Sequence, residues 1–356
     1  MWLDWSLFYP RLSPSYPVNI RRAKMKQISE AELKRWLDAL AGEQTLIAPR
    51  DVAGVLLYRP VQCSGEIAWG FTRPEMSVKN AFFPITDHLL SIQKSGGQVQ
   101  IRETLPEGKQ VIFGVRPCDA HGLQIMDAVF IGKEPVDPYY ARRRENSVLI
   151  GLACQELHSS CFCTSVGGSP EDGTHMDIML YQTEEGYALE AVTPKGQDLL
   201  EGVTFAPEDT DKPVYSYPVQ QFPNPGSVNW ASHFSDEYWQ MVSDRCLSCR
   251  VCAYVCPTCR CFITRDEPVQ GKGEFERVRC WDSCNGANYR MVAGGHRPRS
   301  EKSERLRNRF LCKFLYYASQ YDLSETTSCT GCGRCVDACP VNVDITEILN
   351  DFGRLE

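Results

Sequence analysis

Two cysteine runs with identical spacing carry the clearest chemistry in the chain. The first run consists of Cys246, Cys249, Cys252 and Cys256, followed by Pro257, and the second of Cys329, Cys332, Cys335 and Cys339, followed by Pro340. The pattern C-x₂-C-x₂-C-x₃-C-P is typical of loops that wrap a cubane iron–sulfur cluster. Three thiolates on such a loop can reach three irons of one cluster, while the fourth points away. Proline then ends the segment, because it has no N–H to continue a helix.

The fourth cysteine of each run is expected to serve the cluster of the other run, as in two-cluster ferredoxins. We therefore assign one [4Fe-4S] cluster to Cys246, Cys249, Cys252 and Cys339. We assign the second to Cys329, Cys332, Cys335 and Cys256. Zinc explains the pattern less well, since zinc sites usually take two cysteines from each of two distant segments.

The composition fits a globular redox protein of a reducing compartment. Of the 356 residues, 43% are apolar and 18 are cysteines, which occur in groups rather than as an evenly spread disulfide framework. Grouped cysteines indicate metal-bound thiolates and a cytoplasmic location. No stretch has the length of a membrane span, and Asp4 interrupts the apolar residues 2–9, which argues against a secretory signal. The net charge of −7 gives no support to nucleic-acid binding.

A further group of cysteines belongs to a predicted α/β domain. Val111–Val115 and Val148–Ala153 are typical of buried strands, and a helix is expected between them, with Asp119 as its N-cap. Strand–helix–strand order predicts a parallel pair, so residues that follow the two strands should share one sheet edge.

Four cysteines and one histidine are expected at this edge. Cys118 and Cys154 follow the two strands directly, Cys161 and Cys163 lie on the next loop, and His158 precedes them. Cys118 would also lie at a helix N-terminus, where the dipole favours a thiolate. We expect a third iron–sulfur cluster or a zinc ion at Cys118, Cys154, Cys161 and Cys163, with reduced, buried thiols as the alternative.

The remaining elements complete an N-terminal domain of α/β or α+β class over residues 29–228. Ser29 and Glu32 form a capping box for a helix at 29–41. Strands are expected at 52–58 and 99–103, a small antiparallel extension at 178–181 and 188–192, and a proline-marked linker at about 213–228. Residues 1–28 are expected to form an N-terminal tail or arm.

Residues 229–356 are predicted to form an α-helical ferredoxin-like domain that holds the two cubane clusters. A helix is expected at Arg297–Lys313, where seven Lys or Arg stand against two Glu. Such a charge run is usually a solvated helix face, and the sharper hypothesis is a docking face for an acidic partner. Four cysteines outside the runs either pack, shield or tune the clusters, or ligate another: Cys259, Cys261, Cys280 and Cys284.

Several motifs that ordinary ferredoxins lack make the chain resemble one known family, over residues 29 to 350. These motifs are Phe82-Phe83-Pro84, Arg116-Pro117-Cys118-Asp119, Cys161-Phe162-Cys163-Thr164-Ser165, Cys256-Pro257-Thr258-Cys259-Arg260-Cys261, Trp281-Asp282-Ser283-Cys284, Gly294-Gly295-His296 and Glu304-Arg305-Leu306-Arg307. The family contains the electron-transfer subunits of anaerobic sulfite reductase and the beta subunits of cytoplasmic sulfhydrogenases. The resemblance implies a [4Fe-4S] electron-transfer subunit that stands between a catalytic subunit and a flavin-containing subunit that oxidises NAD(P)H. One departure is Arg250, which stands where the second run has Gly333.

These observations favour a non-catalytic redox subunit, because clusters carry the chemistry and the protein sets their potentials. The chain has no dinucleotide fingerprint and no Walker motif. One alternative is a reductase in its own right that binds flavin or a thiol substrate at the Cys118 edge. Another is a structural zinc scaffold, which would be colourless.

Overall fold

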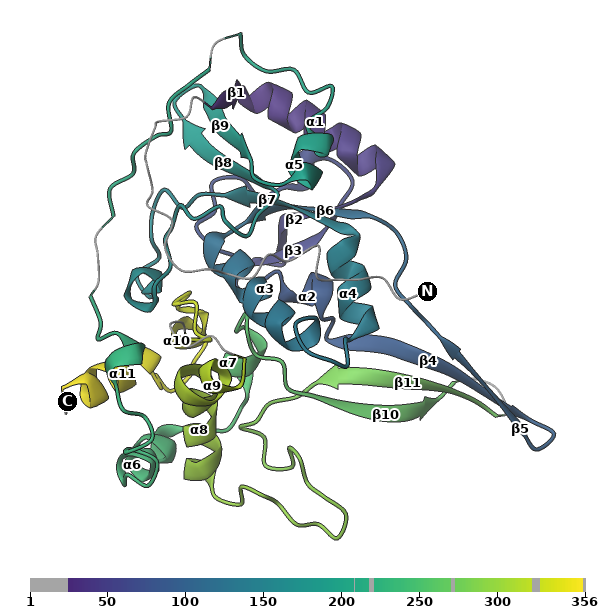
Figure 1. Ribbon diagram of the computed structural model, residues 1–356, viewed down its shortest axis with the longest axis vertical. Helices are drawn as coiled ribbons and strands as arrows, with labels where there is room; N and C mark the ends of the chain where they lie inside the picture. The colour runs from purple at the N-terminus through teal and green to yellow at the C-terminus, as the bar shows by residue number, and fades with distance from the viewer. Residues whose placement is uncertain (1–24, 208, 218–220, 270–272, 322–326, 355–356) are drawn as a thin grey trace.

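Two β-sheets organise the chain (Figure 1). The computed structural model describes residues 25–207, 209–217, 221–269, 273–321 and 327–354. The larger sheet has seven strands in the order β1-β9-β8-β7-β6-β2-β3, and the smaller has four in the order β10-β11-β4-β5. The strands are β1 (Lys26–Ile28), β2 (Thr45–Val52), β3 (Val55–Val61), β4 (Thr86–Ser95), β5 (Gln98–Glu103), β6 (Gln110–Val115), β7 (Ser147–Leu152), β8 (Ile178–Thr183), β9 (Gly186–Ala191), β10 (Phe262–Pro268) and β11 (Glu274–Trp281).

Some of the helices pack against the sheets, and the others lie beside the cysteine runs. They are α1 (Glu30–Glu43), α2 (Lys79–Phe82), α3 (Pro117–Phe130), α4 (Pro138–Glu145), α5 (Pro194–Leu199), α6 (Tyr238–Arg245), α7 (Val251–Tyr254), α8 (Lys302–Leu311), α9 (Tyr317–Gln320), α10 (Arg334–Asp337) and α11 (Ile345–Gly353). A π-helical segment, Cys312–Tyr316, joins α8 to α9. Among the described residues, no helix combines the length and apolar character that a membrane span requires.

The centre of the seven-stranded sheet is parallel, because β2, β6, β7 and β8 pair in one direction. Both faces of these strands are covered, which explains their apolar sequences. On one face Leu33 and Leu37 of α1 pack against Phe113 and Ile150. On the other face α3 and α4 pack against Ile112 and its neighbours. The prediction of an α/β fold is confirmed for this part of the chain.

Most predicted elements of this region are present, with three corrections. The helix predicted at 29–41 is α1, and the Ser29 hydroxyl accepts the Glu32 N–H at 3.2 Å. The strand predicted at 52–58 is wrong in its bounds, because a turn at Ala53 and Gly54, both with positive φ, separates β2 from β3. The predicted extension, β8 and β9, is antiparallel but continues the main sheet through β7.

The third correction concerns Asp119, which was predicted to be the N-cap of α3. The helix begins two residues earlier at Pro117, which suits the first helical turn because proline has no N–H to satisfy there. Asp119 therefore lies inside the first turn and is fully buried.

The predicted N-terminal tail lies largely outside the described residues. Of residues 1–28, the structure describes 25–28, of which Lys26–Ile28 form the edge strand β1, which pairs with β9. Residues 218–220 of the predicted linker also lie outside the described part. The boundaries proposed between the domains remain predictions.

The smaller sheet combines distant parts of the sequence. Strands β10 and β11 lie between the two cysteine runs, and β11 pairs antiparallel with β4 (Figure 1). A buried ion pair fastens this junction, since Arg279 of β11 donates to Asp87 of β4 at 2.7 Å. The prediction of a helical ferredoxin-like domain therefore holds only in part, because residues 262–281 are largely strand.

Aromatic packing organises the helices around the cysteine runs. Trp230 stacks on Phe314 with ring centroids 4.7 Å apart, and Trp239 stacks on Phe310 at 6.0 Å. Phe352 of α11 contacts both tryptophans. This core joins α6, α8 and α11 and holds the loops that carry the cysteines.

Candidate iron–sulfur centre

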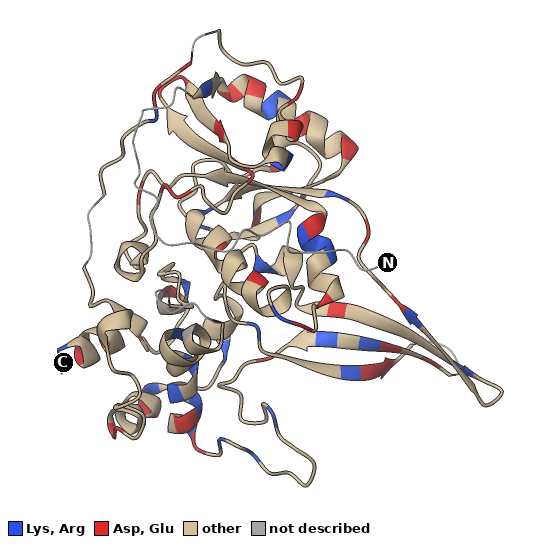
Figure 2. Cartoon of the chain, viewed as in Figure 1, with Lys and Arg blue, Asp and Glu red and all other residues tan. Residues whose placement is uncertain are grey.

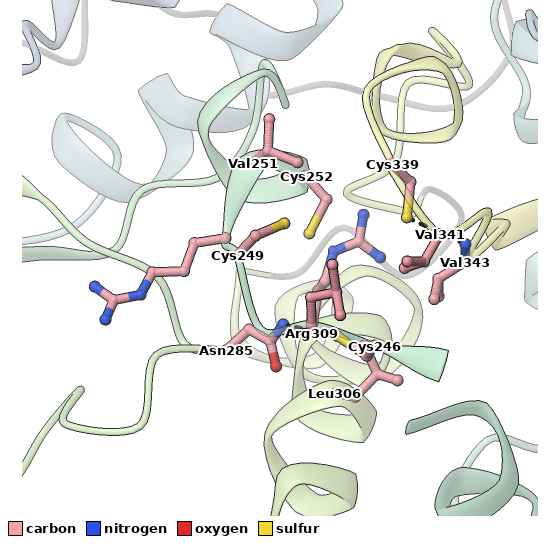
Figure 3. Close-up of a pocket in the computed structure, with 12 residues that line it drawn as sticks. Cys246, Cys249, Val251, Cys252, Asn285, Leu306, Arg309, Cys339, Val341 and Val343 are labelled. Carbon is pink, nitrogen blue, oxygen red and sulfur yellow. Dashed lines mark hydrogen bonds between the residues drawn. The ribbon is translucent and has the colours of Figure 1, made fainter. Parts of the chain in front are cut away.

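Three cysteines of the first run and the last cysteine of the second line one cavity. These are Cys246, Cys249, Cys252 and Cys339, around an open space of ≈ 350 Å³. Figure 3 shows the sulfurs of Cys249, Cys252 and Cys339 turned toward this space, with Arg309 reaching into it. The quartet that the sequence assigns to one cluster is therefore brought together.

Hydrogen-bond donors surround the sulfurs of this first cavity. The backbone N–H of Ser248 donates to Cys246 Sγ at 3.3 Å, and Asn285 Nδ2 donates to the same sulfur at 3.5 Å. The N–H of Val343 donates to Cys339 Sγ at 3.1 Å. Hydrogen-bond donors at this position favour the thiolate form of a cysteine. They also adjust the reduction potential of a cluster that the cysteine binds.

The complementary quartet lines a second cavity. Cys256, Cys329, Cys332 and Cys335 surround an open space of ≈ 330 Å³. Burial and the charge of nearby Cys256 raise the pKa of Cys335 to about 12, although Arg309 acts in the opposite direction. Thiols in this state need a strong Lewis acid to be deprotonated, which iron supplies when it binds.

The second run is packed against the α/β domain. Gly331 and Gly333 have φ of +63° and +72°. A Cβ on Gly333 would lie 2.3 Å from the Ser160 carbonyl oxygen, and one on Gly331 would lie 2.5 Å from Cys163 Cα. Both positions therefore require glycine for their conformation and for the close approach of the Ser160–Cys163 loop.

A buried ion pair fixes the same run. Arg334 donates to Asp119 through two nitrogens, at 2.6 and 2.8 Å, and its Nε donates to the Pro74 carbonyl at 2.8 Å. Bidentate geometry of this kind is strong and directional. Asp119 thus balances the charge of Arg334, which belongs to the second cysteine run.

Arg309 lies between the two cavities and lines both. It is 4% exposed, and its Nε has no hydrogen-bond partner among the described residues. Burial disfavours its charge, but nearby Cys252 and Cys335 act in the opposite direction, and the pKa of Arg309 is raised above the usual arginine value. A cation at this place is suited to balance negative charge in both cavities.

The basic segment Arg297–Lys313 is therefore only partly a solvated face. Figure 2 shows several Lys and Arg positions, coloured blue, along the ribbon of α8. Arg305, Arg309 and Lys313 are buried, and Lys313 Nζ donates to Thr258 Oγ1 beside the second cavity. The interpretation of this charge run as a solvated face is wrong for these three residues, because they are buried rather than in water.

The arrangement of the quartets fits clusters better than single ions. Within the described ranges, no three His, Cys, Asp or Glu side chains converge closely enough to hold one metal ion. The two quartets instead surround a volume, as the ligands of a cubane do. The donor set, the donors to sulfur and the shared cation Arg309 all suit [4Fe-4S] clusters.

Of the four cysteines predicted at the sheet edge, Cys163 is buried, and Cys118, Cys154 and Cys161 are half-buried. Burial raises the pKa of Cys118, Cys161 and Cys163, and the charge of Cys154 contributes to the increase at each of them. Asp119 raises the pKa of Cys118 further, so the thiolate expected from the helix N-terminus is not favoured. Whether this group binds a third cluster or zinc remains a prediction.

His158, the further zinc ligand that the sequence suggested, has other neighbours. Its Nδ1 lies 3.1 Å from Ser160 Oγ and 3.5 Å from Asp337 Oδ2. The adjoining loop contacts the second run directly, since Cys161 Sγ lies 3.7 Å from the Cys332 carbonyl.

Sequence reasoning missed one cysteine and several buried cations. Cys312 lies on the π-helical segment, next to buried Lys313. Lys79 is 1% exposed and donates to the Cys259 carbonyl at 3.0 Å. The one available signal for Arg309 and Lys313 was their helical spacing with Leu306 and Phe310, which places some of the charges toward the core.

Comparison with known proteins agrees with this site. Residues 245–343 match the family described as a 4Fe-4S dicluster domain, which defines the chain as an iron–sulfur protein. The chain is 31% identical over 307 residues to sulfhydrogenase 2 subunit beta of Pyrococcus furiosus, and the match covers 83% of this chain and 88% of the relative. No solved structure matches the chain. The protein belongs to the family of iron–sulfur electron-transfer subunits found in sulfhydrogenases, as their beta subunits, and in anaerobic sulfite reductases.

Proposed function

We propose that this protein passes electrons between a catalytic subunit and a flavin-containing, NAD(P)H-oxidising subunit of a cytoplasmic complex. The catalytic partner would be of the sulfite reductase, hydrogenase or sulfur reductase type. The observation that carries this proposal is the pair of cysteine cavities with Arg309 between them. Two [4Fe-4S] clusters bound there would supply one-electron redox chemistry.

The chain's own residues would bind these clusters and adjust their reduction potentials. We assign Cys246, Cys249, Cys252 and Cys339 to one cluster, and Cys256, Cys329, Cys332 and Cys335 to the other. Arg309 would stabilise the additional negative charge of a reduced state in either cavity, because it is a buried cation close to both. Asn285 and the Val343 N–H would stabilise the thiolates of the first quartet.

The first cavity is the better placed of the two to exchange electrons with a partner. Cys249 is exposed, as are Leu247 at 64% and Met241 at 61%. Cys332 of the second cavity is buried. We therefore propose that a redox partner docks over the first run, where apolar side chains are available for contact.

The alternative of a reductase acting at the Cys118 edge has less support. Cys118 lies next to the buried Asp119–Arg334 pair, and its pKa is raised by burial and by Asp119. A thiol in this environment is a poor nucleophile.

Anaerobic reconstitution tests the proposed function. We expect about eight iron and eight sulfide per chain as a minimum, bleaching of the cluster absorbance by NAD(P)H only when the flavin subunit is present, and no turnover by this chain alone. A Leu247→Asp variant should keep its iron but slow this bleaching, whereas Val214→Asp, at an exposed residue on another segment, should not. Stoichiometric zinc, or four iron or fewer in a loaded sample, would contradict the proposal.

A further inference from the structure

Lys313 is a buried cation that lines only one of the two cysteine cavities. It lines the second cavity and is 4% exposed, whereas Arg309, about one helical turn earlier, lines both. Lys313 therefore gives the second cavity a positive charge that the first cavity does not share.

Hydrogen bonds hold the Lys313 side chain beside a ligand of the second cavity. Its Nζ donates to Thr258 Oγ1, and this hydroxyl in turn donates to the Ser328 carbonyl at 2.7 Å. The same hydroxyl oxygen lies 3.5 Å from the Sγ of Cys256, the cysteine that the first run contributes to the second cavity. Thr258 and Ser328 are fully buried, so bulk water does not screen this contact. One hydroxyl oxygen thus separates the ammonium group from a ligand sulfur.

The backbone of Lys313 is fixed to the second run as well. Lys313 lies on the π-helical segment Cys312–Tyr316, and its carbonyl accepts the N–H of Ser328 at 2.9 Å. Ser328 directly precedes Cys329, the first cysteine of the second run. Single π-helical turns occur frequently at functional sites. The main chain of this segment therefore contacts the second run, while its lysine reaches the end of the first.

The positive charges of the two cavities differ in their compensation. Arg250, which lines the first cavity, is 39% exposed and is paired with Asp282 at 3.2 Å. Within the described ranges Lys313 makes no salt bridge, and its Nζ donates to a neutral hydroxyl. A buried cation without a counter-ion needs compensating negative charge. A cluster bound by Cys256 and its three partners in the second cavity would provide that charge.

We propose that Lys313 selectively raises the reduction potential of the second-run cluster. An electron that moves from the first cluster to the second oxidises one and reduces the other, and it adds one negative charge to the second cavity. Lys313 stabilises this added charge at short range and out of bulk water, where electrostatic interactions are strong. The ratio of the two reduced clusters, and with it the direction of transfer, then depends on one lysine. The inference rests on the proposed function, because it requires a cluster in each cavity.

Lys313→Gln tests this proposal, because glutamine can still donate to Thr258 Oγ1 but carries no charge. The full chain is reconstituted anaerobically with iron and sulfide and titrated with a reductant, and EPR follows each cluster separately. We expect the potential of the second-run cluster to fall by about 59 mV, a tenfold change in a one-electron equilibrium, while that of the first changes much less. Arg307→Gln, which removes one positive charge from a more exposed position of α8, should shift neither potential.

Two further variants separate the charge of Lys313 from its part in the fold. Lys313→Arg keeps the positive charge, so it should retain the parent potential. Thr258→Val keeps the lysine but removes the hydroxyl that holds it beside Cys256, so the second potential alone should fall, by less than in Lys313→Gln. This variant decides the question if Lys313→Gln does not assemble its iron, and an unchanged second potential in it would then overturn the inference.

The outcomes for Lys313 are distinct from those for the proposed function. An unchanged second potential in iron-loaded Lys313→Gln, or an equal fall of both potentials, would overturn the role of Lys313 and leave the two-cluster electron-transfer function standing. A Lys313→Arg potential as low as that of Lys313→Gln would do the same. Zinc in place of iron in the parent protein would instead contradict both.

Discussion

The two cysteine runs have the same spacing but very different surroundings. The first has Arg250 at the position of Gly333 in the second, and both residues adopt the left-handed conformation, with φ of +70° and +72°. The side chain of Arg250 reaches Asp282 at 3.2 Å, whereas Gly333 lies against Ser160. The loop backbone therefore demands a positive φ in both runs, but neighbouring structure forbids a side chain only in the second.

The ion pairs of the two runs differ in the same way. Arg334 and Asp119 are both buried, while Arg250 is 39% exposed in its pair with Asp282. The second run is thus built into the α/β domain, and the first is left near the surface. Substitutions in each run should therefore have different consequences.

The largest effect is expected from the crossed ligands. Cys339→Ala should remove the cluster of the first run, and with it about four iron, although the residue belongs to the second run. Cys246→Ala should give the same spectrum and Cys256→Ala a different one. Iron analysis with EPR checks this, and distinct lost signals in Cys339→Ala and Cys246→Ala would show that the fourth ligands are not exchanged.

Removing the buried arginine should destabilise the protein more than removing the exposed one. Arg334→Leu leaves Asp119 buried without its partner, which is expected to cost about 3–5 kcal/mol. Arg250→Leu breaks a partly exposed pair, worth at most about 1 kcal/mol. The denaturant midpoint for loss of cluster absorbance measures the stability of both variants. Equal midpoints for Arg334→Leu and Arg250→Leu would contradict the expected difference.

The glycine requirement should also be confined to the second run. Gly333→Ala introduces a Cβ against the Ser160 carbonyl at a positive φ, so we expect a loss of about 1–3 kcal/mol or more. Arg250→Gly relieves a non-glycine residue at a similar φ and should be neutral or slightly stabilising. Thermal bleaching of the reconstituted variants gives the comparison, and a stable Gly333→Ala variant would contradict it.

Arg309 should affect both runs alike, since it lines both cavities. Arg309→Met removes a cation that stabilises the reduced state, so both potentials should become more negative, by on the order of 60 mV, or tenfold in a one-electron equilibrium. Arg307→Met, at a more exposed position of the same helix, is the control. Redox titration followed by EPR reports each cluster separately, and a shift confined to one would place Arg309 with that cluster alone.

Features that depend on residues close together in the sequence could be predicted, whereas features that depend on residues far apart could not. The cysteine runs, α1 and the parallel strands β6 and β7 depend on local spacing and periodicity, so they could be predicted. The role of Asp119 could not, because its partner Arg334 lies far along the chain. The same holds for the pairing of β11 with β4, which results from tertiary packing.

The pairing of β4 with β11 has a consequence for the order of synthesis. The β4–β5 hairpin leaves the ribosome early, but its partner strand ends at Trp281. Until then the hairpin presents an open edge, and Val99 and Ile101 remain exposed even in the finished protein. Open edges invite pairing with other chains, and pairing over such a separation is slow. The nascent chain therefore passes through a vulnerable interval, which closes only when the segment between the two cysteine runs has been made.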